Sequence, residues 1–216
     1  MWRYWPKLLF FVLVVRPVVL LVMGLVVSNR ERLPKTGPCI IAANHNSHLD
    51  TMVLMSLFPL RDLPRVRPVA AADYFLANRL MAWFSLNLIG IVPITRDAST
   101  DRDKLFGGCH EALARGDILI LFPEGTRGDP EKMGALKKGI HHLVATAPSR
   151  PTVVPVYLYG LGKALPRGEA LLVPFNIQVA IGEAMTLQGD ATTSVAELEQ
   201  RLHALAAQCR VRYEGA

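Results

Sequence analysis

The residues best suited to chemistry lie in the heptapeptide Asn44–Asp50, Asn-His-Asn-Ser-His-Leu-Asp. Ser47 and Asp50 have the spacing of a capping box at a helix start, which explains these two residues but gives His45 no role. A carboxylate that accepts one imidazole N–H fixes the ring tautomer and supports the imidazolium that forms when the other nitrogen takes a proton. The heptapeptide therefore predicts an acid–base pair of His45 and Asp50.

An alternative use of this stretch is a metal site made of His45, His48 and Asp50. Structural sites with such donors use four ligands, and no fourth ligand is evident. The chain also has no Gly-x-Ser-x-Gly elbow, and its three cysteines share no metal-like spacing. We therefore expect no metal, no organic cofactor and no covalent nucleophile, and favour a histidine base that acts directly on a substrate hydroxyl.

A second polar motif, Phe-Pro-Glu-Gly-Thr-Arg, occupies residues 122–127 after a very apolar run. Its last four residues offer a guanidinium fork, a hydroxyl and free backbone N–H groups, which are the parts of a phosphate or carboxylate cradle. A turn with exposed charges is the simpler alternative. The candidate binding residues in this motif are Glu124, Gly125, Thr126 and Arg127.

Short apolar runs alternate with amphipathic stretches from residue 39 onwards, and this pattern favours an α/β domain with a largely parallel sheet. Ligands of such sheets bind beyond the carboxyl ends of the strands, where both polar motifs fall. The expected strands are Cys39–Ala43, Val69–Ala72, Ile91–Ile94, Ile118–Phe122, Thr152–Leu158, Leu171–Val173 and Ile177–Ile181. The expected helices are Leu49–Leu57, Tyr74–Leu86, Asp101–Arg115, Lys138–Thr146 and Ser194–Arg212.

The net charge of +6 is concentrated near the N-terminus. Residues 1–38 hold six basic side chains and one acidic side chain, whereas residues 39–216 hold 18 basic and 17 acidic ones. Because the body of the protein is close to neutral, we expect no nucleic-acid partner. An anionic membrane surface is the partner that this distribution favours.

The N-terminal segment contains an apolar run over Leu8–Val27 that Arg16-Pro17 interrupts. As one straight helix the run would be about 30 Å long, near the thickness of a bilayer core, but a central arginine and a proline disfavour a plain span. We therefore expect a membrane-associating helical hairpin and linker over residues 1–37, attached to the cytoplasmic face of the cell membrane. A catalytic domain over residues 38–216 follows. A true span and a cleaved signal peptide are the alternatives.

The two polar motifs resemble the first and third signature blocks of the glycerolipid acyltransferases, the family of 1-acylglycerol-3-phosphate acyltransferase and its lysophospholipid relatives. Residues 90–96 and 153–156 are similar to the second and fourth blocks. The second block commonly has an aromatic residue and an aspartate ahead of its arginine, whereas Pro93 and Thr95 stand nearby here. The four blocks occur in the family's order, so the chain is identified as a member over about residues 38–185.

The resemblance implies a single acyltransferase-type α/β domain in which His45 and Asp50 are catalytic. It implies that Pro155 shapes the acyl-donor side, and that the acceptor's glycerol phosphate is bound by Arg96, Glu124, Gly125, Thr126 and Arg127.

The reaction that the resemblance implies moves an acyl group from acyl-CoA or acyl carrier protein to a hydroxyl of a lysophospholipid. The expected acceptor is 1-acylglycerol 3-phosphate and the expected product is phosphatidic acid. Glycerol 3-phosphate, an amino-acid lipid or a glycolipid as acceptor stays open, as does a non-catalytic lipid-binding module. The apolar stretch Tyr74–Leu86 faces the membrane, the acyl chain or the core.

Overall fold

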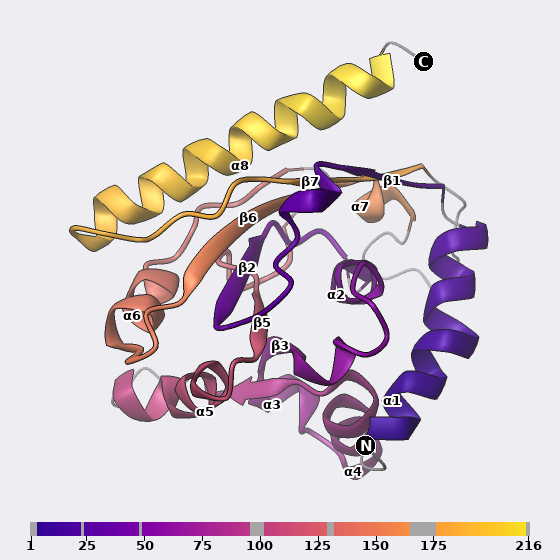
Figure 1. Cartoon of the computed structure of the whole chain (residues 1–216), viewed down its shortest axis with the longest axis horizontal. Coiled ribbons are helices and arrows are strands. Elements are labelled where there is room, and N and C mark those ends of the chain that lie inside the picture. The colour runs from indigo at the N-terminus through magenta and orange to yellow at the C-terminus, as the bar shows by residue number, and fades with distance from the viewer. Residues whose placement is uncertain are drawn as a thin grey trace.

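The computed structural model describes residues 4–22, 24–47, 49–95, 102–128, 132–164 and 176–214. Within them, seven strands form one sheet in the order β1-β7-β6-β2-β5-β3-β4 (Figure 1). All neighbouring strands are parallel except β6 and β7. The strands are β1 (Leu25–Ser28), β2 (Cys39–Ala43), β3 (Val66–Ala71), β4 (Val92–Ile94), β5 (Ile118–Leu121), β6 (Thr152–Tyr159) and β7 (Ile177–Ile181).

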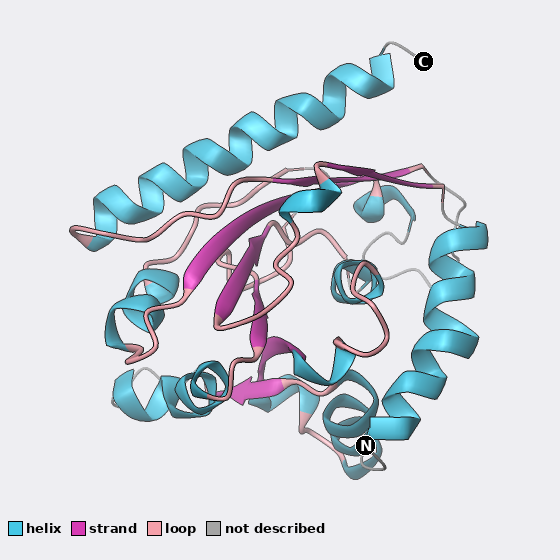
Figure 2. Cartoon of the chain, in the orientation of Figure 1, coloured by secondary structure: helices cyan, strands magenta, loops and turns pink. Residues whose placement is uncertain are grey.

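Helices cover both faces of this sheet, as Figure 2 shows. The longer ones are α2 (Leu49–Ser56), α5 (Arg102–Ala114), α6 (Gly139–Thr146) and α8 (Ala191–Glu214). Every residue of β2 is buried, and alternate residues enter different cores. Ile41 packs in the core on the side of α2, and Ile40 packs in the core on the side of α5, α6 and α8. Burial on both faces explains why this strand is an unbroken apolar run in the sequence.

The expected strands over residues 39–43 and 177–181 coincide with β2 and β7, and four others match a strand to within three residues at each end. The expected strand Leu171–Val173 lies outside the described residues. The expected helix Tyr74–Leu86 is divided, because Asn78 starts a new helix by accepting a hydrogen bond from Met81 N–H at 2.8 Å. Its parts are α3 (Ala72–Phe75), α4 (Arg79–Phe84) and the π-helix η6 (Ser85–Ile89).

The N-terminal segment differs from the expected hairpin, because the described residues form one helical run along the side of the domain (Figure 1). Arg16 donates to Phe58 O at 2.8 Å, so its charge is directed toward the domain. Wide π-type turns flank Pro17 and accommodate its missing N–H. The run consists of α1 (Trp5–Phe10), η2 (Phe11–Val15) and η3 (Val18–Val22), with residues 16 and 17 also helical.

The end of the apolar run, which was expected to belong to the hairpin, also differs from that expectation. Residues 25–28 form β1, the edge strand that pairs in parallel with β7. Phe11, Val15 and Val19 are buried in the core on the side of α2, so the helical run belongs to the folded unit. Among the described residues, no helix combines the length and the apolar character that crossing a bilayer requires. Short helices occur at η4 (Arg30–Arg32), η5 (Leu63–Arg65) and α7 (Leu161–Ala164).

Candidate active site

The two polar motifs meet because they follow adjacent strands. β2 and β5 pair in parallel, with Cys39 opposite Ile118 and Ala42 opposite Leu121. The carboxyl ends of parallel strands lie at the same edge of a sheet, so the segments 44–50 and 122–127 emerge beside each other. A backbone hydrogen bond of 3.1 Å from Gly128 N–H to the carbonyl of His45 joins the two segments directly.

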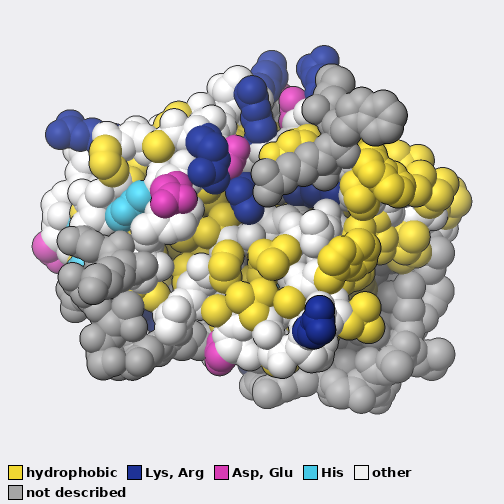
Figure 3. Space-filling model, turned by 90° about the horizontal axis from the view of Figure 1, so that it is seen from below, with side chains coloured by type: hydrophobic (Ala, Val, Ile, Leu, Met, Phe, Trp, Pro, Cys, Tyr) yellow, Lys and Arg dark blue, Asp and Glu magenta, His cyan; other side chains and the backbone are white. Residues whose placement is uncertain are grey.

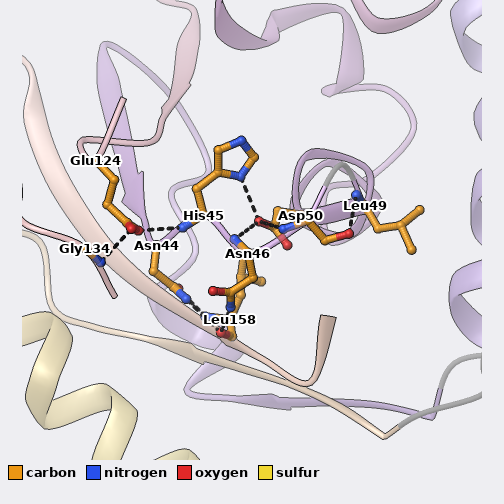
Figure 4. A network of polar contacts seen from close by, with 9 residues as sticks. Asn44, His45, Asn46, Leu49, Asp50, Glu124, Gly134 and Leu158 are labelled. Carbon is orange, nitrogen blue, oxygen red and sulfur yellow. Dashed lines mark hydrogen bonds and ion pairs between the residues drawn. The ribbon is translucent and has the colours of Figure 1, made fainter. Parts of the chain in front are cut away.

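His45 and Asp50 form a close pair at this edge (Figure 4). His45 Nδ1 lies 2.9 Å from Asp50 Oδ2, and the backbone N–H groups of Asn46 and Ser47 donate to the same oxygen at 2.6 and 2.8 Å. A carboxylate only accepts hydrogen bonds, so Nδ1 carries the ring proton and Nε2 is the basic nitrogen. Asp50 thus fixes both the tautomer of His45 and the turn that leads into α2.

The electrostatics of Asp50 favour a proton-accepting His45. Asp50 is fully buried, and this burial raises the pKa of its carboxyl. The hydrogen bonds from His45, Ser47 and Asn46 act in the opposite direction and favour the carboxylate. Because the ionised carboxylate has the imidazole beside it, Asp50 stabilises the imidazolium that forms when Nε2 takes a proton.

The ring of His45 is held from a second side by Phe122. The two rings are stacked, with centroids 4.0 Å apart and an angle of 17° between their planes. In Figure 4 the free ring nitrogen points away from Asp50. His45 and Phe122 both line a cavity of about 400 Å³. The basic nitrogen is therefore available to a molecule bound in this cavity.

The cavity is apolar over most of its wall. It lies between the carboxyl-terminal parts of β3 and β5 and the segment from α3 to η6, and a chain of methylene groups suits such a lining. His45 is its one titratable lining side chain besides Tyr74 within the described part of the chain. The lining residues are His45, Thr51, Met52, Pro68, Val69, Ala70, Ala71, Tyr74, Phe75, Met81, Phe84, Ile89, Ile91, Ile94, Leu121, Phe122 and Gly125.

Glu124 is buried and both of its carboxylate oxygens accept backbone hydrogen bonds. Oε1 accepts from His45 N–H at 2.8 Å, and Oε2 accepts from Gly134 N–H at 2.7 Å (Figure 4). Burial raises the pKa of this carboxyl, whereas the two N–H donors lower it. A Cβ on Gly134 would lie 3.0 Å from Oε2, so a glycine at 134 gives the carboxylate room. Glu124 thus ties the backbone of His45 to a distant loop.

Asn44 holds the other flank of His45. Its side-chain amide forms two hydrogen bonds with the backbone of Leu158 near the end of β6, accepting from N–H at 2.7 Å and donating to the carbonyl at 2.9 Å. Asn46 donates to the same carbonyl at 3.1 Å. The sequence motif alone does not reveal this role of Asn44, because its partner is 114 residues away and only the sheet order brings β6 next to β2.

The remainder of the second motif turns toward the cavity rim. Gly125 has a φ of 74° and lines the cavity. Lys137 Nζ lies 2.8 Å from the position that a Cβ on Gly125 would occupy, so the lysine passes close over the glycine. Thr126 is exposed and Arg127 is partly exposed. No hydrogen bond or ion pair joins Arg127 to another residue in the part of the chain that the structure describes.

Other candidates from the sequence are separate from this site or outside the described residues. Arg96 lies outside them, as does His48. Burial raises the pKa of Cys39 to about 11 and that of Cys109 to about 12, so both are protonated thiols at neutral pH. Neither cysteine lines the cavity. In the described residues, no group of three His, Cys, Asp or Glu side chains gathers in a way that could hold a metal ion.

Comparison with known proteins gives one family. Residues 24–159 match the family model described as Acyltransferase. A crystal structure of the 1-acyl-sn-glycerophosphate acyltransferase PlsC from Thermotoga maritima has a similar fold, with a TM-score of 0.73 and 19% identity over 93% of this chain and 79% of that one.

Several curated proteins are similar in sequence, and three of them are named 1-acyl-sn-glycerol-3-phosphate acyltransferases. The protein from Pseudomonas aeruginosa is 31% identical over 182 residues, which cover 82% of this chain and 65% of the relative. The protein from Chlamydomonas reinhardtii is 34% identical over 74% of this chain and 46% of its own length. A chloroplastic protein from Arabidopsis thaliana is 29% identical over 79% of this chain and 48% of its own length. The chain therefore spans about half the length of the plant and algal relatives.

Proposed function

The chain belongs to the acyltransferase family, and from this premise we propose that it acylates the free hydroxyl of 1-acylglycerol 3-phosphate, giving phosphatidic acid. The observation that carries the proposal is the His45–Asp50 pair beside an apolar cavity, since it joins a base to a place for an acyl chain. The activity printed in the relatives' names supports this choice of acceptor. The donor is a thioester, acyl-CoA or acyl carrier protein, and the proposed reaction uses neither a metal nor an organic cofactor.

The proposed mechanism needs one base and no covalent enzyme intermediate. His45 Nε2 takes the proton of the acceptor hydroxyl while the hydroxyl oxygen bonds to the thioester carbonyl carbon. The tetrahedral intermediate collapses with cleavage of the carbon–sulfur bond, and the imidazolium returns its proton to the leaving thiolate. Asp50 keeps Nδ1 protonated and stabilises the imidazolium throughout.

The acceptor phosphate has its place at the rim formed by Gly125, Thr126 and Arg127 in this proposal. The guanidinium of Arg127 has no protein partner among the described residues, and it can form two parallel hydrogen bonds with a phosphate. Arg96, at the end of the second signature block, is the proposed second cation. Glu124 contributes by positioning His45 and the rim, because both of its oxygens are already occupied by backbone donors.

Membrane attachment is part of the same proposal. The helical run at the N-terminus presents apolar side chains to solvent, and the first 38 residues carry most of the net positive charge. Both features favour binding to an anionic bilayer. We place the enzyme at the cytoplasmic face of the cell membrane, where it meets lysophospholipid in the bilayer and the thioester donor in solution.

The test is product analysis by mass spectrometry with purified protein in detergent. Each acceptor is offered with acyl-CoA and with acyl carrier protein: 1-acylglycerol 3-phosphate, glycerol 3-phosphate, a lyso amino-acid lipid and a lysoglycolipid. We expect phosphatidic acid from the wild-type protein and none from His45→Ala. A product from another acceptor alone would replace the proposed substrate within the same chemistry. If no acceptor is acylated, the proposed enzymatic function is wrong, and a non-catalytic lipid-binding module is the remaining interpretation.

A further inference from the structure

The segment from α3 to η6 presents a row of large apolar side chains to solvent. We use the term α4 face for the exposed side chains of Tyr74, Leu76, Leu80, Trp83 and Leu86. Leu80 is 78% exposed and Trp83 is 53% exposed, although their helix sits in a well-packed domain. A contiguous apolar surface of this kind marks a place where another surface binds.

The other side of the same segment is also apolar, because it lines the cavity beside His45. Phe75, Met81 and Phe84 belong to the cavity wall. Of the α4 face, Tyr74 also reaches this wall, while the other four side chains lie outside it. A helix that is apolar on all sides is stable only when both sides are covered. The side of the segment that lines the cavity is covered by the rest of the domain. The α4 face is not covered by the domain, so it needs an apolar environment outside the protein.

The α4 face continues into the exposed side of the N-terminal helical run. Phe10 of α1 and Phe84 of α4 pack edge to face, with ring centroids 5.5 Å apart. On α1 and η2, the neighbouring exposed side chains are Trp5, Leu9 and Leu13. Figure 3 views the molecule from the side of α3 and α4, and it shows hydrophobic side chains gathered on this face and along the edge that α1 occupies. Two segments far apart in the sequence thus form one apolar surface.

The composition of this surface fits a lipid bilayer. Trp5, Tyr74 and Trp83 have the apolar ring and polar N–H or O–H that suit the headgroup region. Lys7 and Arg16, the two cations of residues 4–22, donate to carbonyls of the domain. The exposed charges of residues 72–91 are one cation, Arg79, and one anion, Asp73, so this surface is apolar and close to neutral, which suits contact with lipid. We propose that the α4 face is a second membrane-docking element, which inserts beside α1 and rests the wall of the acyl cavity on the bilayer. The inference builds on the proposed function, because a lipid acceptor must pass from the bilayer to His45.

The first experiment measures whether Trp83 enters the bilayer. The chain has three tryptophans, and Trp2→Phe with Trp5→Phe leaves Trp83 as the single fluorophore. This variant is bound to vesicles of phosphatidylethanolamine and phosphatidylglycerol that contain brominated acyl chains. We expect strong quenching of Trp83 fluorescence and a blue shift relative to the protein in dilute detergent. Vesicle-bound protein with unquenched Trp83 would overturn the inference and leave the proposed function intact.

The second experiment measures partition and turnover in Leu80→Glu, with Ala204→Glu as the matched control. Ala204 is exposed on α8, at the opposite side of the molecule, and its variant gains the same charge in a helix. We expect Leu80→Glu to lower vesicle partition by about tenfold, because a leucine loses its burial, and the control to lower it far less.

Turnover separates this inference from the proposed function. Leu80→Glu should keep the wild-type kcat toward monomeric short-chain acceptor but lose about tenfold in kcat/KM toward acceptor held in vesicles. A wild-type protein without any transferase activity, together with quenched Trp83, would refute the function and keep the docking surface. If Leu80→Glu instead splits a detergent-solubilised dimer while partition is unchanged, the α4 face is an interface between copies and the inference is wrong.

Discussion

The proposed proton transfer at His45 depends on one imidazole nitrogen, Nε2, whose orientation is set by the contacts of the ring with Asp50 and Phe122. His45→Ala should therefore abolish transfer, and Asp50→Asn should lower kcat by about 10³–10⁴-fold, the effect of losing an orienting carboxylate in hydrolase triads. The asparagine keeps an oxygen for the N–H groups of Asn46 and Ser47, so the turn should persist. Steady-state kinetics with circular dichroism as the folding control measures this. A His45→Ala variant with more than about a tenth of the wild-type kcat would refute the mechanism.

A substitution at Glu124 can distinguish two roles for this residue, which are positioning His45 and contacting the substrate directly. In Glu124→Gln one oxygen becomes an NH₂ group, which cannot accept from His45 N–H or Gly134 N–H. We expect kcat to fall by about tenfold, the value of one lost hydrogen bond, while the acceptor KM stays near that of the wild type. A variant with a raised acceptor KM and an unchanged kcat would instead show that Glu124 touches the substrate.

Arg127 is the residue to vary for acceptor binding. An ammonium cannot form the two parallel bonds of a guanidinium, so Arg127→Lys should not restore the wild-type acceptor KM. We expect that KM to rise by about 10- to 100-fold, which corresponds to a lost charge-assisted hydrogen bond. The donor KM, measured in the same assays, serves as the internal control. A loss confined to the donor KM would move Arg127 to the thioester side of the site.

At the scale of single residues, the sequence was enough to predict the contact between His45 and Asp50, but not the groups that hold this pair. His45 and Asp50 are five residues apart, and a local motif with helix-start spacing is enough to pair them. Asn44 bonds to Leu158 and Glu124 bonds to the backbone of His45, and no sequence pattern links these partners. Their contacts exist because β6, β2 and β5 are neighbours in the sheet, which is a long-range property of the fold.

At the scale of elements, the turn after β5 depends on Gly125. Its φ of 74° is the left-handed conformation, and an added Cβ would lie 2.8 Å from Lys137 Nζ. Gly125→Ala should destabilise the fold by about 1–2 kcal/mol, and denaturant unfolding measures this cost. Gly107→Ala in α5 is the control, because it has open space and a helical position where alanine stabilises by up to about 1 kcal/mol. Equal effects of the two variants would contradict the role of the turn.

The bounds of fully buried strands could be predicted from the sequence. The bounds of elements that depend on pairing with a distant strand or on a tertiary hydrogen bond could not. β2 and β7 are fully buried apolar runs, and their bounds follow from the sequence alone. β1 was hidden inside an apolar stretch that resembles a membrane segment, and only its pairing with β7 makes it a strand. Arg16-Pro17 suggested a bend in the N-terminal helix. Instead, Arg16 donates a hydrogen bond to the carbonyl of Phe58, and wide helical turns on both sides of Pro17 accommodate the proline.

At the scale of the whole molecule, a buried lysine ties the N-terminal helix to the sheet. Lys7 on α1 is only 2% exposed, and it donates to the carbonyl of Val66, the first residue of β3, at 2.9 Å. Burial and, to a smaller extent, the neighbouring charge of Arg67 lower the pKa of Lys7 to about 7, although Asp117 acts in the opposite direction. The unfolded chain holds this proton up to a pKa near 10.5, so it binds more protons than the folded chain between about pH 7 and 10.5. The free energy of unfolding therefore rises with pH across this window.

Replacing Lys7 by methionine removes the cost of the buried charge and leaves an unbranched side chain that is one atom shorter. Below pH 7 the folded wild type must bury an ammonium, so Lys7→Met should be more stable by roughly 3 kcal/mol after the lost hydrogen bond to Val66 is taken into account. The advantage should shrink as pH rises from 7 toward 10.5, where the wild-type lysine is neutral in both states. Denaturant unfolding in a mild detergent at pH 6, 8 and 10 measures it, with the exposed Lys35→Met as the control. A difference that stays constant from pH 6 to pH 10 would show that Lys7 does not change protonation on folding, and the coupling between the helix and the sheet would then be independent of pH.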